Sequence, residues 1–188
     1  MWARFDREVR HRRWHPFVPA EYDRVLAVLC ELWRPGLRFL ELGSAMGIIT
    51  VMADLLGYEA YGIEIDERLV QSAREITVRY GSSARFAAGS FLPQGWVWRP
   101  RDGDGRLGTI GEGTSGYQGL GLPLDEFGLV YGYPWGGEEA MMLDLFRAHG
   151  APDGRLLLHL CSGELRLMRR GRIERTWPYA GDPGHLAP

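Results

Sequence analysis

Two short stretches decide the fold of this chain: FLELGSAMG at Phe39–Gly47 and YGIEID at Tyr61–Asp66. The first is typical of a buried strand that runs into a glycine-bearing turn, and the second of a strand that ends in acidic residues. Between them, residues 46–56 are apolar almost all round, which predicts a helix packed on several sides. A strand, a tight turn, a helix and a second strand form the crossover unit of a parallel sheet with right-handed connections.

The same alternation of strands and helices continues on both sides of this unit. Strands are predicted at 38–42, 59–63, 85–88, 127–131 and 155–160, and helices at 22–33, 46–56, 67–80 and 138–149. Asp66 is expected to cap the third of these helices, and Gly81 to close it. Residues 164–169 and 172–177 flank a turn and predict a β-hairpin. The predicted architecture is a three-layer α/β/α fold, in which a doubly wound, mostly parallel sheet carries an antiparallel C-terminal hairpin.

A length of 188 residues, 45% of them hydrophobic, suits a single domain. We expect this domain at residues 19–180, between an N-terminal arm at 1–18 and a C-terminal tail at 181–188. Residues 94–121 contain nine glycines, which predicts an insertion with no stable helix. The insertion follows the third predicted strand, at the sheet edge where ligands bind in such folds, so it is either a surface loop or a lid.

Composition excludes several classes of function. The formal net charge is −2 and all 22 basic residues are arginine, whereas a dedicated nucleic-acid binder carries a marked basic excess. The arginine cluster at 166–175 is therefore expected to be a solvated face. No apolar run reaches the roughly 18 residues of a membrane span, and no secretory signal is present, which predicts a cytoplasmic protein. Cys30 and Cys161 are expected to be buried free thiols, and His11 and His15 have no third partner for a metal.

The spacing within the glycine-bearing turn separates two kinds of ligand. A pyrophosphate-binding loop has the form G-x-G-x-x-G, which here would fall at Gly43, Ala45 and Ile48 and would lack two of its glycines. Written as acid-x-G-x-G-x-G, residues 41–47 depart from the pattern only at Ala45. In this second form the turn resembles the first motif of the class I S-adenosylmethionine (SAM) methyltransferases.

That resemblance implies a SAM cofactor and a set of contacts to it. Glu41 would hold the methionyl ammonium, directly or through water, and Ala45 would be tolerated if its φ stays negative. Glu64 ends a predicted strand 21 positions after Gly43, where a carboxylate can accept both ribose hydroxyls. Loss of Glu64 should weaken nucleoside binding and leave folding little changed. The implied cofactor-binding residues are Glu41, Gly43, Ser44, Ala45, Gly47, Glu64, Ile65, Ser90 and Phe91.

The fourth predicted strand runs into Gly132-Tyr133-Pro134-Trp135. Family members that methylate exocyclic amines or glutamine amides carry (D/N)-P-P-(Y/F/W) there, and this chain retains only the aromatic end of that motif. Methylation of a base amine is therefore not favoured. The resemblance implies that Tyr133 and Trp135 wall the acceptor pocket, since aromatic faces suit a sulfonium cation. Glu138, Glu139 and His159 are candidate general bases without an assignment.

The leading hypothesis is a SAM-dependent methyltransferase that acts on a small-molecule or protein acceptor. Nucleic acid is a less favoured acceptor, and the sequence does not determine the oligomeric state. One alternative is a non-catalytic module that uses the same pocket for regulation or assembly. Ala45 and Ser90 support it, because both depart from the residues that the family pattern has at these positions. A third is an NAD-dependent oxidoreductase, which the loop spacing and the lack of a second, substrate-binding domain disfavour.

Overall fold

The computed structural model describes residues 20–98, 113–134 and 138–179. The strands are β1 (Arg38–Leu42), β2 (Glu59–Glu64), β3 (Arg85–Ala88), β4 (Leu129–Gly132), β5 (Arg155–His159), β6 (Leu165–Arg169) and β7 (Arg172–Trp177). The helices are α2 (Tyr22–Leu32), α3 (Ile48–Leu55), α4 (Glu67–Tyr80), α5 (Gly116–Leu120), the 3-10 helix η1 (Leu124–Glu126) and α6 (Glu138–His149).

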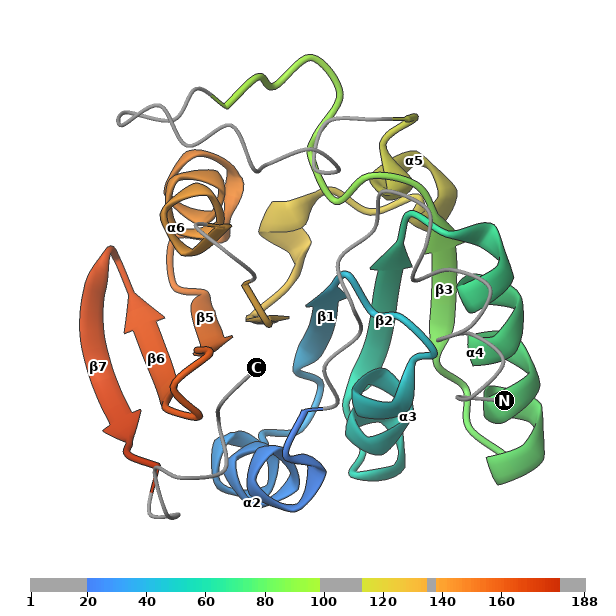
Figure 1. Ribbon diagram of the computed structural model, residues 1–188, viewed down its shortest axis with the longest axis horizontal. Helices are drawn as coiled ribbons and strands as arrows, with labels where there is room; N and C mark the ends of the chain where they lie inside the picture. The colour runs from blue at the N-terminus through green and yellow to red at the C-terminus, as the bar shows by residue number, and fades with distance from the viewer. Residues whose placement is uncertain (1–19, 99–112, 135–137, 180–188) are drawn as a thin grey trace.

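The seven strands form one sheet in the order β3-β2-β1-β4-β5-β6-β7 (Figure 1). Strands β1 to β5 pair in parallel, whereas β6 pairs with β5, and β7 with β6, in the antiparallel sense. Because the order reverses at β1 and β4, the chain winds outward in both directions from the sheet centre. The predicted doubly wound α/β fold with an antiparallel C-terminal hairpin is confirmed.

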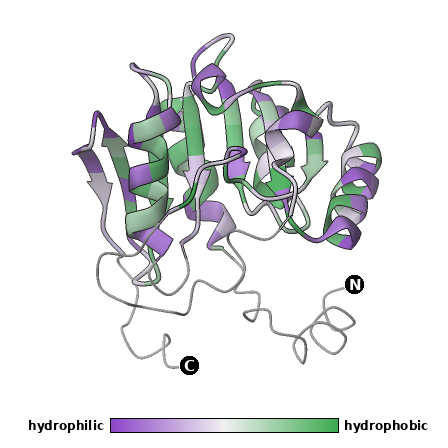
Figure 2. Cartoon of the chain, turned by 90° about the horizontal axis from the view of Figure 1, so that it is seen from above, coloured by the Kyte–Doolittle hydropathy of each residue, from purple (hydrophilic) through white to green (hydrophobic). Residues whose placement is uncertain are grey.

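The two faces of the sheet carry separate apolar clusters. Side chains alternate along a strand, so Phe39 of β1 packs with α2 and α3, whereas Leu40 packs on the opposite face with η1 and α6. Both side chains are fully buried, and burial of a residue of this size contributes about 1.5–3 kcal/mol. Seen from above, the helices lie on both sides of the sheet (Figure 2). This is the predicted three-layer arrangement.

The ends of the helices follow local chemistry. Asp66 caps α4 by accepting a hydrogen bond from the Arg68 N–H at 2.8 Å, and Gly81 closes the same helix in the left-handed conformation, as predicted. Helix α3 begins at Ile48, two residues later than predicted, because Gly47 has a φ of 73°. A left-handed residue cannot continue a right-handed helix, so the turn extends to Gly47.

The prediction that residues 94–121 hold no helix is wrong at the end of that segment, where α5 packs on β2 and β3. Gly116 allows this approach, because a Cβ on it would lie 2.6 Å from Ile63 Cγ2. The Tyr117 side chain is buried, and Ser115 forms a parallel bridge with Ser90 beyond β3. Tertiary contacts therefore hold a short helix that propensity disfavours. Residues 99–112 lie outside the described residues.

Two surface predictions have different outcomes. Cys30 and Cys161 are free thiols, but both are exposed, so the prediction of burial is wrong; Cys30 lies off the apolar stripe of α2. The arginines near the hairpin pair with carboxylates: Arg166 with Glu139 and Glu164.

Among the described residues, no helix has both the length and the hydropathy that a membrane span requires. The predicted N-terminal arm and C-terminal tail fall outside the described residues.

Candidate functional site

The loop between β1 and α3 bends through three left-handed residues. Gly43, Ala45 and Gly47 have φ values of 71°, 47° and 73°. The condition under which Ala45 was expected to be tolerated, a negative φ, is therefore not met. A residue with a Cβ pays about 1–2 kcal/mol for this conformation, and such strain persists only where the surroundings impose it. Here the Ala45 N–H donates to Glu64 Oε2 at 2.8 Å.

The two glycines of the loop are needed for different reasons. At Gly43, apart from the residue itself and its two chain neighbours, no atom of the described residues lies within 4 Å of the position that a Cβ would take, and the residue is exposed. At Gly47, a Cβ would lie 2.5 Å from the ring of Phe86 and 2.8 Å from Ala73. Gly47 therefore serves close packing of the loop on its own domain. The space beside Gly43 is open to a ligand.

Ser44 adds an unsatisfied polar group to this loop. Its residue is 3% exposed, and its Oγ has no hydrogen-bond partner among the described residues. The N–H groups of Gly43 and Ser44 are used by the fold, since both donate to the carbonyl of Ile63 at 2.9 Å. A buried hydroxyl without a partner costs free energy. Ser44 Oγ faces β2, because a Cβ on Gly62 would lie 2.7 Å from it, so the fold shields this hydroxyl.

Glu64 ties the loop to the end of β2. Its side chain is buried; Oε2 accepts from Ala45 N and Oε1 accepts from Asp66 N at 3.0 Å. Burial raises the pKa of Glu64, and the backbone donors partly oppose this rise. The carboxylate is thus a structural clamp as well as a candidate ribose ligand. These two contacts argue against the prediction that loss of Glu64 leaves folding little changed, because the N–H groups of Ala45 and Asp66 would then lack an acceptor.

Glu41 lies on β1, next to β2, and its carboxyl accepts hydrogen bonds from the first turn of α3. Its Oε2 accepts from the backbone N–H of Thr50 at 3.0 Å and from the Thr50 hydroxyl at 2.5 Å. Burial raises the pKa of Glu41 to about 8, although the two Thr50 donors lower it. This rise favours the protonated form of the carboxyl. An ammonium ion placed beside it would favour the ionised form.

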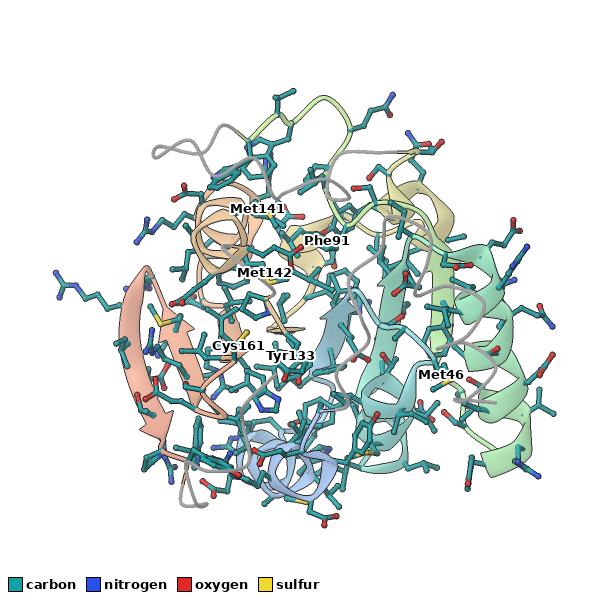
Figure 3. The ribbon with its side chains drawn as sticks, viewed as in Figure 1. Met46, Phe91, Tyr133, Met141, Met142 and Cys161 are labelled. Carbon is teal, nitrogen blue, oxygen red and sulfur yellow. The ribbon has the colours of Figure 1, made fainter. Side chains whose placement is uncertain are left out.

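Ser90 and Phe91 lie beyond β3, beside the end of β2. The N–H of Gly89 donates to the Glu64 carbonyl at 2.9 Å, which holds this segment next to the clamp. Ser90 is buried, and its Oγ accepts from Leu92 N at 3.1 Å. Phe91 packs against the cluster beneath η1 and α6 (Figure 3). The structure therefore brings the end of the third strand, with the Ser90 hydroxyl, to the loop region.

Sequence reasoning missed an aromatic stack at the ends of β4 and β5. The Tyr133 ring lies parallel to the His159 ring at 12°, with centroids 4.6 Å apart, and His159 Nδ1 is 3.1 Å from the Tyr131 hydroxyl. Burial lowers the pKa of His159 to about 4, so its ring is neutral at pH 7. The signal was the period of two, because Tyr131 and Tyr133 share a face; the pairing with β5 was not available from it. Trp135 lies outside the described residues.

The acceptor end of the site has one further neighbour. Cys161 lies close to Tyr133 (Figure 3), and its thiol donates to the carbonyl of Pro134 at 3.4 Å. Burial raises the pKa of Tyr133, and the charge of Cys161 adds to that rise. Tyr133 is half-buried and packs on the α2 side of the sheet. One of its faces is therefore occupied by His159.

Comparison with known proteins gives this geometry a context. No family model matches the chain. An RNA methyltransferase from Salinibacter ruber, solved with S-adenosyl-L-homocysteine, superposes with a TM-score of 0.53 at 19% identity, over 75% of this chain and 76% of that one. The chain has the class I methyltransferase fold. A SAM-dependent methyltransferase from Thiobacillus denitrificans, also with S-adenosyl-L-homocysteine, gives a TM-score of 0.50 at 20% identity, over 82% of this chain and 53% of that one.

One curated relative extends the class I likeness to sequence. The ribosomal protein L11 methyltransferase of Thermus thermophilus is 35% identical over 65 residues, which is 35% of this chain and 26% of the relative. The chain therefore spans about a quarter of the length of the curated relative that it matches.

Proposed function

We propose that this protein transfers a methyl group from SAM to an acceptor. The observation that carries the proposal is the loop at residues 43–47, which Glu64 clamps through Ala45 N at 2.8 Å beside the open space at Gly43. When bound, SAM would supply an already activated methyl group. The protein's part is then to hold the donor, position the acceptor and exclude water.

The residues present fit such a donor. Each carboxylate oxygen has two lone pairs, so Glu64 can accept the ribose hydroxyls while it keeps its bonds to Ala45 and Asp66. The open space at Gly43 leaves room for the amino-acid tail. The first N–H groups of α3 have no partner within the helix and carry the positive end of its dipole, which favours a carboxylate. Glu41 would face the ammonium.

On the acceptor side, Tyr133 and Trp135 are proposed to wall the pocket, together with Ile65 on the adenine side. The stack with His159 fixes the Tyr133 ring, so one aromatic face is presented in a defined orientation. A small molecule or a protein is the favoured acceptor. In support, Arg170 pairs with Asp153 at 2.8 Å and Arg175 with Glu31 at 2.9 Å, which reduces the positive charge available to a nucleic-acid backbone.

Isothermal titration tests the donor. We expect S-adenosylhomocysteine and SAM to bind with one site per chain, and NAD to give no heat. A Gly43→Val variant should lose this binding, because its branched side chain would fill the open space. Circular dichroism should first show that the variant folds in spite of the left-handed φ of 71° at this position. Binding of NAD without binding of S-adenosylhomocysteine would reject the proposal in favour of a dinucleotide site.

A non-catalytic SAM-binding module is the second candidate, because Gly132 supplies no polar group to an acceptor and Ala45 strains the loop. Turnover separates the two. Protein given SAM with a tritiated methyl group and fractionated small-molecule and protein pools should label one pool, whereas protein with Gly43→Val should label none. Tight donor binding with no label in any pool favours the regulatory module.

A further inference from the structure

The outer sides of helices α2 and α3 carry an apolar band. The two helices pack against each other on one face of the sheet (Figure 1). Each contributes three apolar residues at the spacing i, i+4 and i+7, which places them on one side of a helix. All six are exposed or half-buried: Leu26, Cys30 and Trp33 at α2, and Ile48, Met52 and Leu55 on α3. We call this set the outer band.

The contacts of α2 show that its three residues face α3. Arg24 and Glu31 contact β7, so their flank of the helix faces the C-terminal hairpin. Trp33 lies on the opposite flank, where a Cβ on Gly57, just after α3, would lie 3.2 Å from its Nε1. The apolar residues of the two helices are therefore neighbours and form one surface.

The outer band has no cover within the described residues. On the inner side of α3, Ile49 and Ala53 pack in the cluster beneath α2. The members of the outer band belong to none of the apolar clusters that the described residues form, and Leu55 is 57% exposed. A helix that is apolar all round is normally buried, and a contiguous exposed apolar patch marks an interaction site.

The charges at the two ends of α2 select a second copy of this chain as the partner. Asp23 precedes the band by about one turn, Arg34 directly follows it, and both are exposed. If two copies of α2 pack antiparallel about a two-fold axis, Asp23 of each copy meets Arg34 of the other. The same axis pairs Leu26 with Trp33 and brings the two Cys30 residues together. The charged and the apolar pairs are centred within about one residue of each other, so a single register satisfies both.

The same axis also matches α3 with its own copy. Helix α2 leads into β1 and α3 leads out of it, so both helices run against β1 and parallel to each other. A two-fold axis that crosses both helices therefore reverses both. Ile48 would then lie near Leu55 of the second copy, and the two Met52 residues would meet.

We propose that two copies of this chain associate through the outer band, with α2 on α2 and α3 on α3 in antiparallel pairs. Such an interface is isologous, because each copy offers the same surface to the other. No residue predicted to bind the cofactor belongs to the band. The inference therefore stands without the proposed methyl transfer.

Sedimentation equilibrium of the full chain tests the association. We expect a dimer, and we expect Leu55→Glu to raise its dissociation constant by roughly tenfold or more, because the interface would then bury an unpaired charge. Val78→Glu is the matched control, since Val78 is 82% exposed on α4, outside the band; it should dimerise as the wild type does. Both variants should keep the wild-type circular dichroism and bind S-adenosylhomocysteine unchanged.

Charge reversal tests the register. Asp23→Arg and Arg34→Asp should each weaken the dimer, because like charges then face each other at both ends of α2. An equimolar mixture of the two variants should restore a heterodimer, in which every pair is again opposite in sign. In a Cys161→Ser background, a short bismaleimide should link Cys30 to Cys30 in the wild-type register.

Several results would overturn the proposal. One is a monomer at every concentration, which would mean that residues 1–19 or another protein cover the band. Dimers of equal strength from Leu55→Glu and Val78→Glu would place the interface elsewhere. Failure of the mixed charge variants to associate, or no link between Cys30 residues in a proven dimer, would reject the antiparallel pairing of α2.

Discussion

Removal of the Glu64 carboxylate should weaken both the fold and the cofactor site. In Glu64→Ala, the N–H groups of Ala45 and Asp66 lose their acceptors, which lie at 2.8 and 3.0 Å. A buried donor left unsatisfied costs about 1–3 kcal/mol. Burial already raises the pKa of Glu64, so relief of that desolvation offsets part of the loss. We expect the free energy of unfolding to fall by about 2 kcal/mol.

The same substitution should also weaken the binding of S-adenosylhomocysteine. Loss of a buried charged acceptor costs about 1.5–3 kcal/mol, which is roughly tenfold to a hundredfold in the dissociation constant of S-adenosylhomocysteine. Urea denaturation followed by circular dichroism measures the first effect, and isothermal titration the second, under conditions where the variant is folded.

Glu75→Ala is the matched control, because Glu75 is an exposed acid in the middle of α4. It should change the free energy of unfolding by less than about 0.5 kcal/mol and leave donor affinity as it is. If Glu64→Ala unfolds like this control, the clamp on the loop does not exist. If it is destabilised but binds S-adenosylhomocysteine normally, Glu64 is structural and is not the ribose ligand.

Three further outcomes follow from the geometry. Burial raises the pKa of Glu41 from 4.5 to about 8 in the folded state, so its contribution to the free energy of unfolding is full below pH 4.5 and is lost as pH rises to about 8. Urea midpoints of Glu41→Gln should fall less than those of the wild type over this range. Burial lowers the pKa of His159 from 6.5 to about 4, so its contribution to stability falls as pH drops from about 6.5 towards 4, where the Glu41 contribution opposes it. Thermal midpoints of His159→Phe should therefore rise relative to those of the wild type as pH is lowered over this range. Gly43→Ala should lower the free energy of unfolding only by the left-handed strain of about 1–2 kcal/mol, but titration should show weaker binding of S-adenosylhomocysteine. Gly47→Ala should unfold at a much lower urea concentration, because its Cβ would lie 2.5 Å from the Phe86 ring. Equal urea midpoints of the two variants would contradict this difference.

The fold could be predicted because its signals are local. The strands β1 and β3 and helix α6 begin and end where hydrophobic period and turn residues predict them. The cap at Asp66 and the left-handed end at Gly81 could also be predicted from the sequence, since each depends on a few neighbouring residues. Helix α5 was not legible, because its stability comes from Ile63 and β3 rather than from its own glycine-rich sequence.

The candidate site, too, could be predicted only where its signals are local. The motif located the loop and Glu64, but it could not give the φ of Ala45, because that angle is imposed by the carboxylate of a residue 19 positions later. It also could not show that Glu41 caps α3, or that His159 stacks on Tyr133. Each of these contacts joins different elements of the sheet, whose order in space is not the order in sequence.

By itself, the sequence determined the alternating α/β pattern, the glycine-bearing turn after β1 and the acid at the end of β2, since hydrophobic period and backbone sterics act within a few residues. Only the tertiary structure decided which side chains share a proton or a hydrogen bond, and which lack a partner altogether. The stack of the Tyr133 ring on the His159 ring belongs wholly to this second class. The two rings come from the ends of β4 and β5, which pair side by side in the sheet, and no local pattern in the chain records that pairing.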